Sequence, residues 1–401
     1  MLHKLYMLIL CIFNIQNTQR CILNTRIDFG QPLPVILRNG KLLEPDDNNG
    51  NVILDHGDVL TISCGEYRSI RHPNAIQEVP TAIVSCESGD RFKNDALLNF
   101  PGSFSLFHCN DAPDYHSRRT NRTCFEGLPI IEVGYTIHNE FYPSYETCFN
   151  DVMFNPIYSK YTQKPYNALY QTHVERPYFQ DNYNYKNIPV DSLFSQIGQR
   201  AAVAQMVGPL IDTYINKNEY LSRGHLAAKT DFVYAFTERA TFHYVNCAPQ
   251  WSGLNGGNWN TLEVKLRDHI HHVGYNTVIY TGTYGVTQLT NQYGQRVDLY
   301  LHRGANPNVG IPIPQYFYKV VYEPSSKRGI AYVGINNPYY SLREAKDMFF
   351  CQDMCRNNNS FSWLTWHPDN PSEGYTFCCS IPDFRATINH LPYFDVCGVL
   401  I

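Results

Sequence analysis

The sequence predicts an α+β protein, with a small disulfide-tied β-rich module ahead of a larger mixed unit, and three observations support this. Short runs of β-forming residues that end in cysteine recur at roughly even spacing early in the chain. Further apolar, strand-like runs lie between residues 130 and 333. Between them, residues 220–263 change from an extended to a helical pattern. We therefore expect a first module at residues 21–125 and a second unit at residues 126–401.

Length and composition place the chain among globular proteins. It has 401 residues, of which 43% are hydrophobic and 17% charged, enough to bury a large core and to form two domains. The formal net charge of −4 adds nothing to affinity for phosphate, but a turnover enzyme needs only a local basic groove. The 30 tyrosines suit core packing and also base stacking, and composition leaves both open.

The first twenty residues have the pattern of a secretory signal. Lys4 precedes a mostly apolar run to Ile15, which is too short to span a bilayer. We expect residues 1–20 to be a signal peptide, and therefore a secreted, extracellular protein with no membrane partner.

The cysteine count agrees with export. Of 13 cysteines, Cys11 lies in the predicted signal and the remaining 12 are even in number, which predicts mostly paired cysteines in an oxidising compartment. A zinc site is the alternative, and it would use Cys351, Cys355, Cys378 and Cys379. The sequons at Asn121 and Asn358 are candidate glycosylation sites.

The first module shows strand patterns but no catalytic constellation. Residues 60–64, 83–86 and 105–109 are strand-like runs that each end in cysteine. His56 lies between Asp55 and Asp58, which allows a metal site or a polar turn.

The pattern changes from about residue 129. Residues 130–137 predict a strand that opens the sheet of the second unit. Residues 142–187 are dense in Tyr, Asn and Pro and predict a long surface excursion. Residues 189–216 contain a helical pattern, with Asp191 as its N-cap.

Residues 220–263 carry most of the residues that could perform chemistry. Arg223 and His225 are two apart, so in a strand they face the same side. Residues 240–246 are rich in β-formers and predict a second strand, followed by a turn at residues 249–251 and an Asn/Gly-rich loop. A helix should follow, because apolar residues recur at helical spacing at Trp259, Leu262, Leu266 and Ile270.

The remaining elements are simpler. Residues 277–282, 316–321 and 329–333 predict strands, and the tail from residue 346 to the end holds five cysteines. The cluster of His269, His271 and His272 could bind a metal ion, but histidines near the C-terminal end of a helix also interact favourably with the helix dipole.

This arrangement resembles the DNA/RNA non-specific endonucleases, the ββα-metal group that includes endonuclease G, and most of all the secreted invertebrate double-stranded ribonucleases. The resemblance covers roughly residues 130–345. The residues that carry it are Arg223-Gly224-His225, Asn246, Pro249-Gln250, Leu254-Asn255, Trp259 and Leu262-Glu263. The chain departs from the wider family at Ser222, where most members have Asp, and at Val245, where they have Ser.

The resemblance implies a ββα-metal domain with a central antiparallel sheet, and it assigns roles. The catalytic set would be His225 as general base, Arg223 on the phosphate, Asn246 orienting the site and Glu263 holding metal-bound water. Asn255 would ligate Mg²⁺ or Mn²⁺. Substrate contacts would come from Arg223, Gln250 and Arg176.

The resemblance also implies a function. We expect a secreted, divalent-metal-dependent endonuclease that cuts DNA and RNA, double-stranded RNA included, leaves 5′-phosphates and has weak sequence specificity. It would act as a monomer or homodimer. Two alternatives stay open: an inactive nucleic-acid-binding protein on the same fold, and a phosphodiesterase for small substrates.

Overall fold

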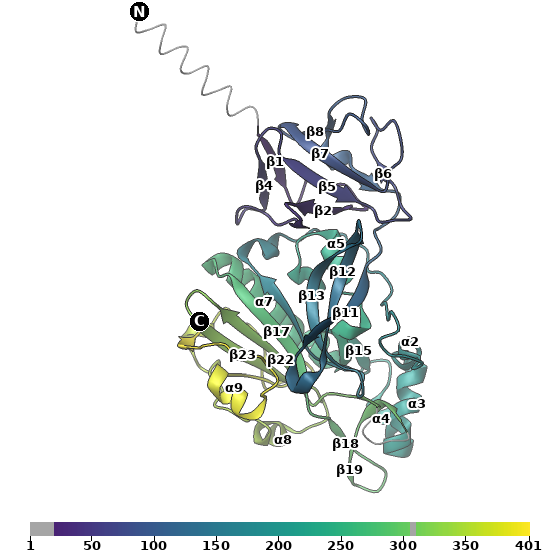
Figure 1. Cartoon of the computed structure of the whole chain (residues 1–401). Helices are drawn as coiled ribbons and strands as arrows, with labels where there is room; N and C mark the ends of the chain where they lie inside the picture. The colour runs from purple at the N-terminus through teal and green to yellow at the C-terminus, as the bar shows by residue number, and fades with distance from the viewer. Residues whose placement is uncertain (1–19, 305–309) are drawn as a thin grey trace, which may run out of the picture.

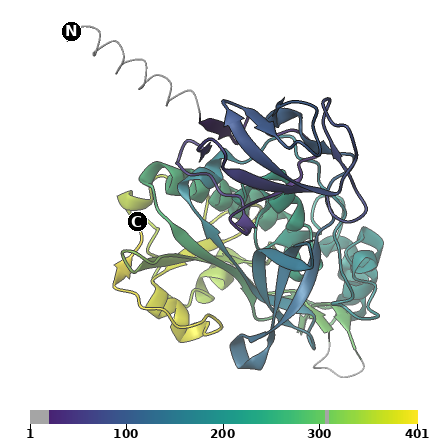
Figure 2. The same ribbon diagram turned by 45° about the horizontal axis from the view of Figure 1, so that its top comes forward.

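A computed structural model describes residues 20–304 and 310–401, and it shows a β-rich module packed on a larger sheet-based unit (Figures 1 and 2). The predicted signal peptide lies outside the described residues, apart from Arg20. No helix within the described ranges is long and apolar enough to cross a bilayer.

The module has a six-stranded antiparallel sheet in the order β3-β2-β5-β7-β8-β9, with two smaller strand pairs, β1-β4 and β6-β10. The strands are β1 (Cys21–Asn24), β2 (Val35–Arg38), β3 (Lys41–Leu42), β4 (Asn51–Leu54), β5 (Val59–Ser63), β6 (Ile70–Arg71), β7 (Thr81–Ser88), β8 (Arg91–Lys93), β9 (Gly102–Ser103) and β10 (His108–Cys109). Residues 105–109 were expected to form one strand, but a 3₁₀ turn, η1 (Phe104–Leu106), takes up the first two residues, and only β10 at the end of the run is a strand.

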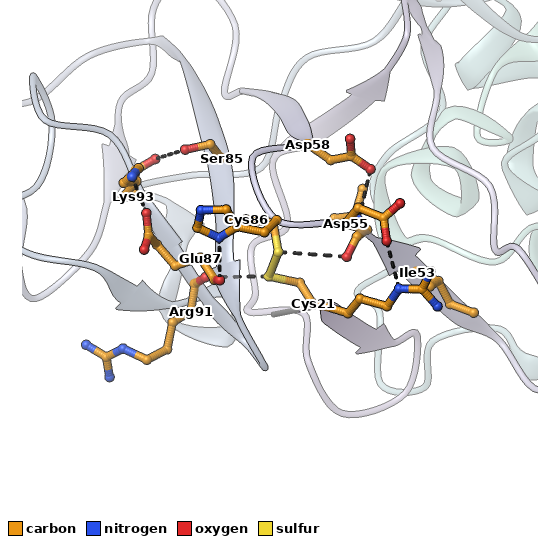
Figure 3. The surroundings of a disulfide bond; sticks show 12 residues. Cys21, Ile53, Asp55, Asp58, Ser85, Cys86, Glu87, Arg91 and Lys93 are labelled. Atoms are coloured by element: carbon orange, nitrogen blue, oxygen red, sulfur yellow. Dashed lines mark hydrogen bonds and ion pairs between the residues drawn. A yellow bond between two sulfur atoms is a disulfide. The ribbon is translucent and has the colours of Figure 1, made fainter. Parts of the chain in front are cut away.

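Two disulfides join these strands, Cys21–Cys86 (Figure 3) and Cys64–Cys109. The nearby Asp55–Asp58 segment is a turn in which the Asp55 N–H donates to Asp58 Oδ2 at 3.0 Å. The His56 Nδ1 lies 2.8 Å from the Glu87 carbonyl oxygen. This stretch is therefore the polar turn of the two alternatives, and the module is held by covalent links as well as by its sheet.

The larger unit is organised around a nine-stranded sheet, with main-path order β11-β12-β13-β14-β17-β22-β23-β24 and β25 parallel to β23. Its strands are β11 (His116–Thr123), β12 (Pro129–Ile137), β13 (Glu140–Asn150), β14 (Asn155–Gln163), β17 (Thr277–Tyr284), β22 (Tyr316–Glu323), β23 (Arg328–Ile335), β24 (Thr376–Cys379) and β25 (Gly398–Val399). The predicted antiparallel central sheet is thus present.

Two predictions about this sheet need comment. The prediction of a surface excursion over residues 142–187 is wrong in its first part, since β13 and β14 lie there; Pro143 is tolerated because the ladder shifts register beside it. Strand β11 lies before residue 125 yet pairs with β12. The division of the chain into domains at residue 125 stays a prediction.

The sheet has a core on each face, as the two-residue period of strand side chains requires. Phe317 and Val321 of β22 join the cluster that includes the main helix, α7 (Asn260–Val273). Tyr318 and Val320 face the opposite cluster, where α9 (Ile381–Thr387) packs Phe384 against Tyr318 at 5.1 Å between ring centroids.

The remaining elements connect these layers. The helices are η2 (Phe125–Gly127), η3 (Pro165–Leu169), α2 (Val190–Leu193), α3 (Gln196–Val207), η4 (Gly208–Leu210), α4 (Ile211–Tyr214), η5 (Lys229–Asp231), α5 (Ala235–Ala240), η6 (Tyr244–Asn246), α6 (Ser252–Leu254), η7 (Asn255–Trp259), α8 (Leu342–Asp347) and η8 (Asn359–Phe361). The small strand pairs are β15 (Leu221–His225) with β16 (Cys247–Trp251), β18 (Gln288–Thr290) with β19 (Arg296–Asp298), and β20 (Tyr300–Arg303) with β21 (Gly310–Pro312).

The predicted N-cap Asp191 is wrong, because the long helix α3 begins after Ser195, whose hydroxyl accepts from the Gly198 N–H. Further disulfides join Cys124–Cys148, Cys351–Cys379 and Cys355–Cys378. The last two exclude the zinc alternative, since these sulfurs are bonded to each other. Within the described residues Cys247 and Cys397 are unpaired and the other cysteines form five disulfides, so the expectation of mostly paired cysteines is confirmed.

Candidate active site

The site is built on the two-stranded ribbon of β15 and β16 and on the helix that follows it. The ribbon is antiparallel, with His225 opposite Cys247 and Arg223 opposite Pro249. Gly224 permits this packing, because a Cβ there would lie 2.5 Å from Gln250 Oε1. Pro249 lacks an N–H, which is tolerated because β16 pairs only with β15.

The prediction of a second strand at residues 240–246 is wrong. The Thr241 hydroxyl donates back to the Glu238 carbonyl at the end of α5, and His243 Nδ1 accepts from the Val245 N–H at the start of η6. Polar side chains that bond the local backbone compete with strand pairing. The strand therefore starts at Cys247, and the expected turn at residues 249–251 is part of it.

His225 sits in an aromatic recess with one ring nitrogen unused. Its ring lies 5.0 Å from that of Phe179 and 4.9 Å from that of Phe242. The Nε2 atom is buried and has no hydrogen-bond partner among the described residues. Burial, and after it the charge of Arg176, lowers the pKa of His225 to about 3, against a hydrogen bond from the ring to the Arg223 backbone that raises it. The imidazole is therefore neutral at pH 7, which leaves Nε2 able to accept a proton.

The two arginines, Arg223 and Arg176, differ in how far other side chains neutralise their charge. Arg223 donates from Nε to the Tyr244 hydroxyl at 2.9 Å and from Nη2 to Asp191 Oδ1 at 2.8 Å. Arg176 is exposed, stands 5.2 Å over the Phe242 ring and forms no ion pair within the described residues. The same Phe242 ring lies 4.9 Å from the His225 ring, which places Arg176 near the imidazole. Arg176 thus offers an unneutralised cation next to His225, whereas the charge of Arg223 is shared with Asp191.

Asn246 is a brace of the site. It is fully buried. Its Oδ1 accepts from the Ser159 hydroxyl and the Ala227 N–H, both at 2.8 Å. Its Nδ2 donates to the carbonyls of Ala227 and Thr241 at 2.9 and 3.0 Å. These four bonds tie the end of β15 to β14 and use the amide completely, so Asn246 can position the site but has no atom left for substrate.

Gln250 and Asn255 are the opposite case, with amides that the protein leaves open. Gln250 is fully buried, yet neither its Oε1 nor its Nε2 has a hydrogen-bond partner in the described chain. Asn255 is partly exposed, and its side chain forms no hydrogen bond with the residues described. The expected Asn/Gly loop around it is instead helical, since α6 and the π-turn η7 run directly into α7.

Glu263 lies on α7, eight residues after Asn255. The predicted spacing of this helix is confirmed, because Trp259, Leu262, Leu266 and Ile270 are all buried. Burial, and with it the charge of Asp231, raises the pKa of the Glu263 carboxyl, while Lys319 and Arg267 act in the opposite direction.

A buried ionic network lies under Glu263 and escaped sequence analysis. Asp231 accepts from Arg267 at 2.7 Å and from the Tyr161 hydroxyl at 2.6 Å, and Lys319 donates to the same hydroxyl at 2.9 Å. Asp231, Arg267 and Lys319 are each at most 4% exposed. With Glu263 they place two carboxyl side chains beside two cationic side chains, so their formal charges cancel beneath the site. No sequence motif marks these partners, because they come from three separate elements.

The residues present fit a hard divalent cation. Asn255 presents an unused amide oxygen and Glu263 a carboxylate, which are the donor types that Mg²⁺ and Mn²⁺ take. Gln250 lies on the other face of the ribbon from Arg223 and His225. The histidine alternative is not supported: His269 stacks on Trp363 at 4.2 Å between centroids, and His271 Nδ1 lies 2.8 Å from the Pro165 carbonyl. Both are packed as structural residues.

Comparisons with known proteins show what the chain is similar to. A family model described as DNA/RNA non-specific endonuclease matches residues 126–384. A salivary endonuclease of Lutzomyia longipalpis is 25% identical over 333 residues, covering 82% of this chain and 74% of the relative. Salivary protein Tsal2A of Glossina morsitans morsitans is 26% identical and covers 93% and 92%. A salivary endonuclease of Culex quinquefasciatus is 33% identical over 181 residues, covering 43% and 45%.

Among solved structures, a match is titled a complex of EndoG with EndoGI. It is 23% identical, has a TM-score of 0.33, and covers 48% of this chain and 71% of that one.

Proposed function

The chain belongs to the DNA/RNA non-specific endonuclease family, and from this premise we propose that it is a secreted, divalent-metal-dependent enzyme that hydrolyses both DNA and RNA. Nuclease activity follows from the family, whose members depend on a metal ion. The broader substrate range, double-stranded RNA included, and the 5′-phosphate products are part of the proposal. Secretion is supported by relatives named as salivary proteins.

One observation carries the mechanism: the buried Nε2 of His225 has no partner in the described chain. Burial lowers the pKa of the ring, which favours the neutral form at pH 7. A water molecule bound there would lose its proton to Nε2 as it attacks phosphorus. General-base assistance of this kind contributes about 100- to 10,000-fold. Arg176 would contact the phosphate oxygens first, since its charge is free, and Arg223 would add a second contact.

The metal would be held by Asn255, with Glu263 orienting its water shell, and Gln250 would contact substrate. When bound, the ion neutralises charge on the phosphate and stabilises the leaving oxygen. Asn246 would keep the end of β15 in place. The proposed contacts are all to phosphate, so sequence preference should be weak.

Two further features belong to the proposal. Asn121 and Asn358 are both exposed, as glycosylation of their sequons would require. The enzyme would act as a monomer or homodimer.

The test is cleavage of supercoiled plasmid and of long double-stranded RNA by the purified secreted chain, with Mg²⁺ and with chelator. We expect Mg²⁺-dependent cutting of both, ending in 5′-phosphates. Binding without cutting would favour the inactive binding protein. Activity only on small phosphodiesters would favour the alternative of a phosphodiesterase for small substrates.

A further inference from the structure

A short segment near the C-terminus packs directly on the turn that carries Asn255. We call this segment, residues 367–374, the clamp. It lies between η8 and β24, more than a hundred residues after the turn in sequence. Its contacts fall on both sides of Asn255, on residues 253 and 254 before it and on residues 257 and 258 after it.

Asn258 makes the polar contacts to the clamp. Its Nδ2 donates to the His367 carbonyl at 2.9 Å and to the Gly374 carbonyl at 2.5 Å, and its Oδ1 accepts from the His367 N–H at 2.8 Å. Its own N–H donates to the Glu373 carbonyl at 2.8 Å. Asn258 is fully buried, so one side chain and one backbone group join the turn to the clamp by four hydrogen bonds.

Close backbone packing completes the contact. A Cβ at Gly257 would lie 2.6 Å from Glu373 Cα, and one at Gly253 would lie 2.7 Å from the Ser372 carbonyl oxygen. From the other side, a Cβ at Gly374, whose φ is +87°, would lie 2.5 Å from Leu254 Cδ1. Surfaces this close cannot shift independently.

The clamp is itself firmly anchored. Arg356 donates to both oxygens of Asp369 at 2.9 and 2.6 Å. The clamp leads into β24, which pairs with β23 of the central sheet and ends in Cys378 and Cys379, both disulfide-bonded. The turn that bears Asn255 is therefore held against a covalently stapled support.

We propose that the clamp, acting through Asn258, positions the metal-ligating turn and so sets the affinity of the site for its divalent ion. The inference rests on the proposed role of Asn255 as ligand. Asn258 is a positioning residue: its amide is used up on the clamp. Loosening it would let the Asn255 amide leave the geometry the ion requires, and outer partners of metal ligands typically contribute about 10- to 100-fold in metal affinity.

The experiment is calorimetric titration of the full chain with Mn²⁺, comparing Asn258→Ala with wild type. We expect about a 10-fold or greater rise in the Mn²⁺ dissociation constant. Hydrogen exchange of the metal-free protein should show faster exchange over residues 252–259. The KM for DNA at saturating Mn²⁺ should change little, because Asn258 does not face substrate.

Asn337→Ala is the matched control. Asn337 is also buried and makes three side-chain hydrogen bonds, to Thr287, Gln288 and Tyr339, away from the turn. It should lose stability but keep Mn²⁺ affinity. Unchanged Mn²⁺ affinity in folded Asn258→Ala, or an equal loss in both variants, would overturn the proposal.

Two further variants keep the outcome decisive. If Asn258→Ala does not fold, Asp369→Asn removes the Arg356 ion pair and should weaken Mn²⁺ binding in the same direction. Unchanged Mn²⁺ affinity in Asp369→Asn would contradict the proposed role of the clamp.

Asn255→Ala separates the clamp proposal from the assignment of Asn255 as metal ligand. If it binds Mn²⁺ as wild type does, the ligand assignment is wrong, and the clamp fails with it. If it loses binding while Asn258→Ala does not, only the clamp fails.

Discussion

Two histidines, 18 positions apart, lie in regions with opposite hydrogen bonding; His225 is half-buried and His243 is fully buried. Burial lowers the pKa of both His225 and His243 to about 3. Around His243 every ring nitrogen is used: Nε2 donates to Asn182 Oδ1 at 2.9 Å and Nδ1 accepts from the Val245 N–H. Around His225, Nε2 has no partner in the described chain. A shifted pKa alone therefore does not identify a catalytic group; what sets His225 apart from His243 is an unpartnered Nε2 on the strand that also carries Arg223.

The largest expected effect is on catalysis. His225→Ala should lower kcat/KM for plasmid cleavage by about 100- to 10,000-fold, since the general base is lost. His243→Ala should instead lower the free energy of unfolding by about 1–3 kcal/mol, because buried partners are left unsatisfied, while kcat/KM per folded molecule stays near wild type. Equal losses of activity in the two variants would contradict the claim that His225 is catalytic and His243 structural.

The ionic network of Asp231, Arg267 and Lys319 below the site can be tested through the stability of the protein. Asp231→Asn leaves Arg267 and Lys319 buried without their carboxylate, so unfolding in denaturant should show a loss of about 3–5 kcal/mol. The control is Asp395→Asn, which breaks the exposed pair with Lys327 and should change stability little. If Asp231→Asn is as stable as this control, the network does not support the site.

Acid should act on the same pair of histidines. The unfolded chain protonates His243 near pH 6.5, but the folded chain does so only near pH 3. Stability is therefore lost as the pH falls below about 6.5, by about 2–3 kcal/mol at pH 4.5. His243→Gln should remove this loss, measured as the difference in unfolding free energy between pH 7 and pH 4.5. Equal acid sensitivity of variant and wild type would show that His243 titrates normally.

The smallest expected effect concerns Arg223. The Asp191 carboxylate, whose side chain is 78% exposed, neutralises part of its charge. Asp191→Asn should free that charge and tighten DNA binding by a few-fold at low salt, with a steeper salt dependence. Binding can be measured in a His225→Ala background, which prevents cleavage. Weaker binding would mean that Asp191 orients Arg223 instead of competing for it.

Local patterns predicted those parts of the molecule that depend on neighbouring residues. The strand with Arg223 and His225 and the helix from residue 260 were found from spacing, because a period of two or of 3.6 is written in the sequence. Strand β16 was misplaced because Thr241 and His243 bond their own backbone, which β-propensity ignores.

The support of the site could not be predicted in this way. Asp191 meets Arg223 across 32 residues, Asp231 meets Lys319 across more than 80, and Asn258 meets the clamp across more than 100. Such partners share no period or motif, so only the fold brings them together. The resemblance to a family supplied the candidate roles, and the structure separated the open groups, Arg176, Gln250 and Asn255, from the braced one, Asn246.

The central claim is that His225 is a neutral base with a free Nε2, and ¹⁵N NMR of the histidine rings in the full chain tests it most directly. The account predicts that between pH 5 and pH 7 His225 stays neutral, with Nε2 unprotonated, and that its shifts do not move through a titration near pH 6.5. A His225 that takes up a proton near or above pH 6.5, or that carries its proton on Nε2, would contradict it.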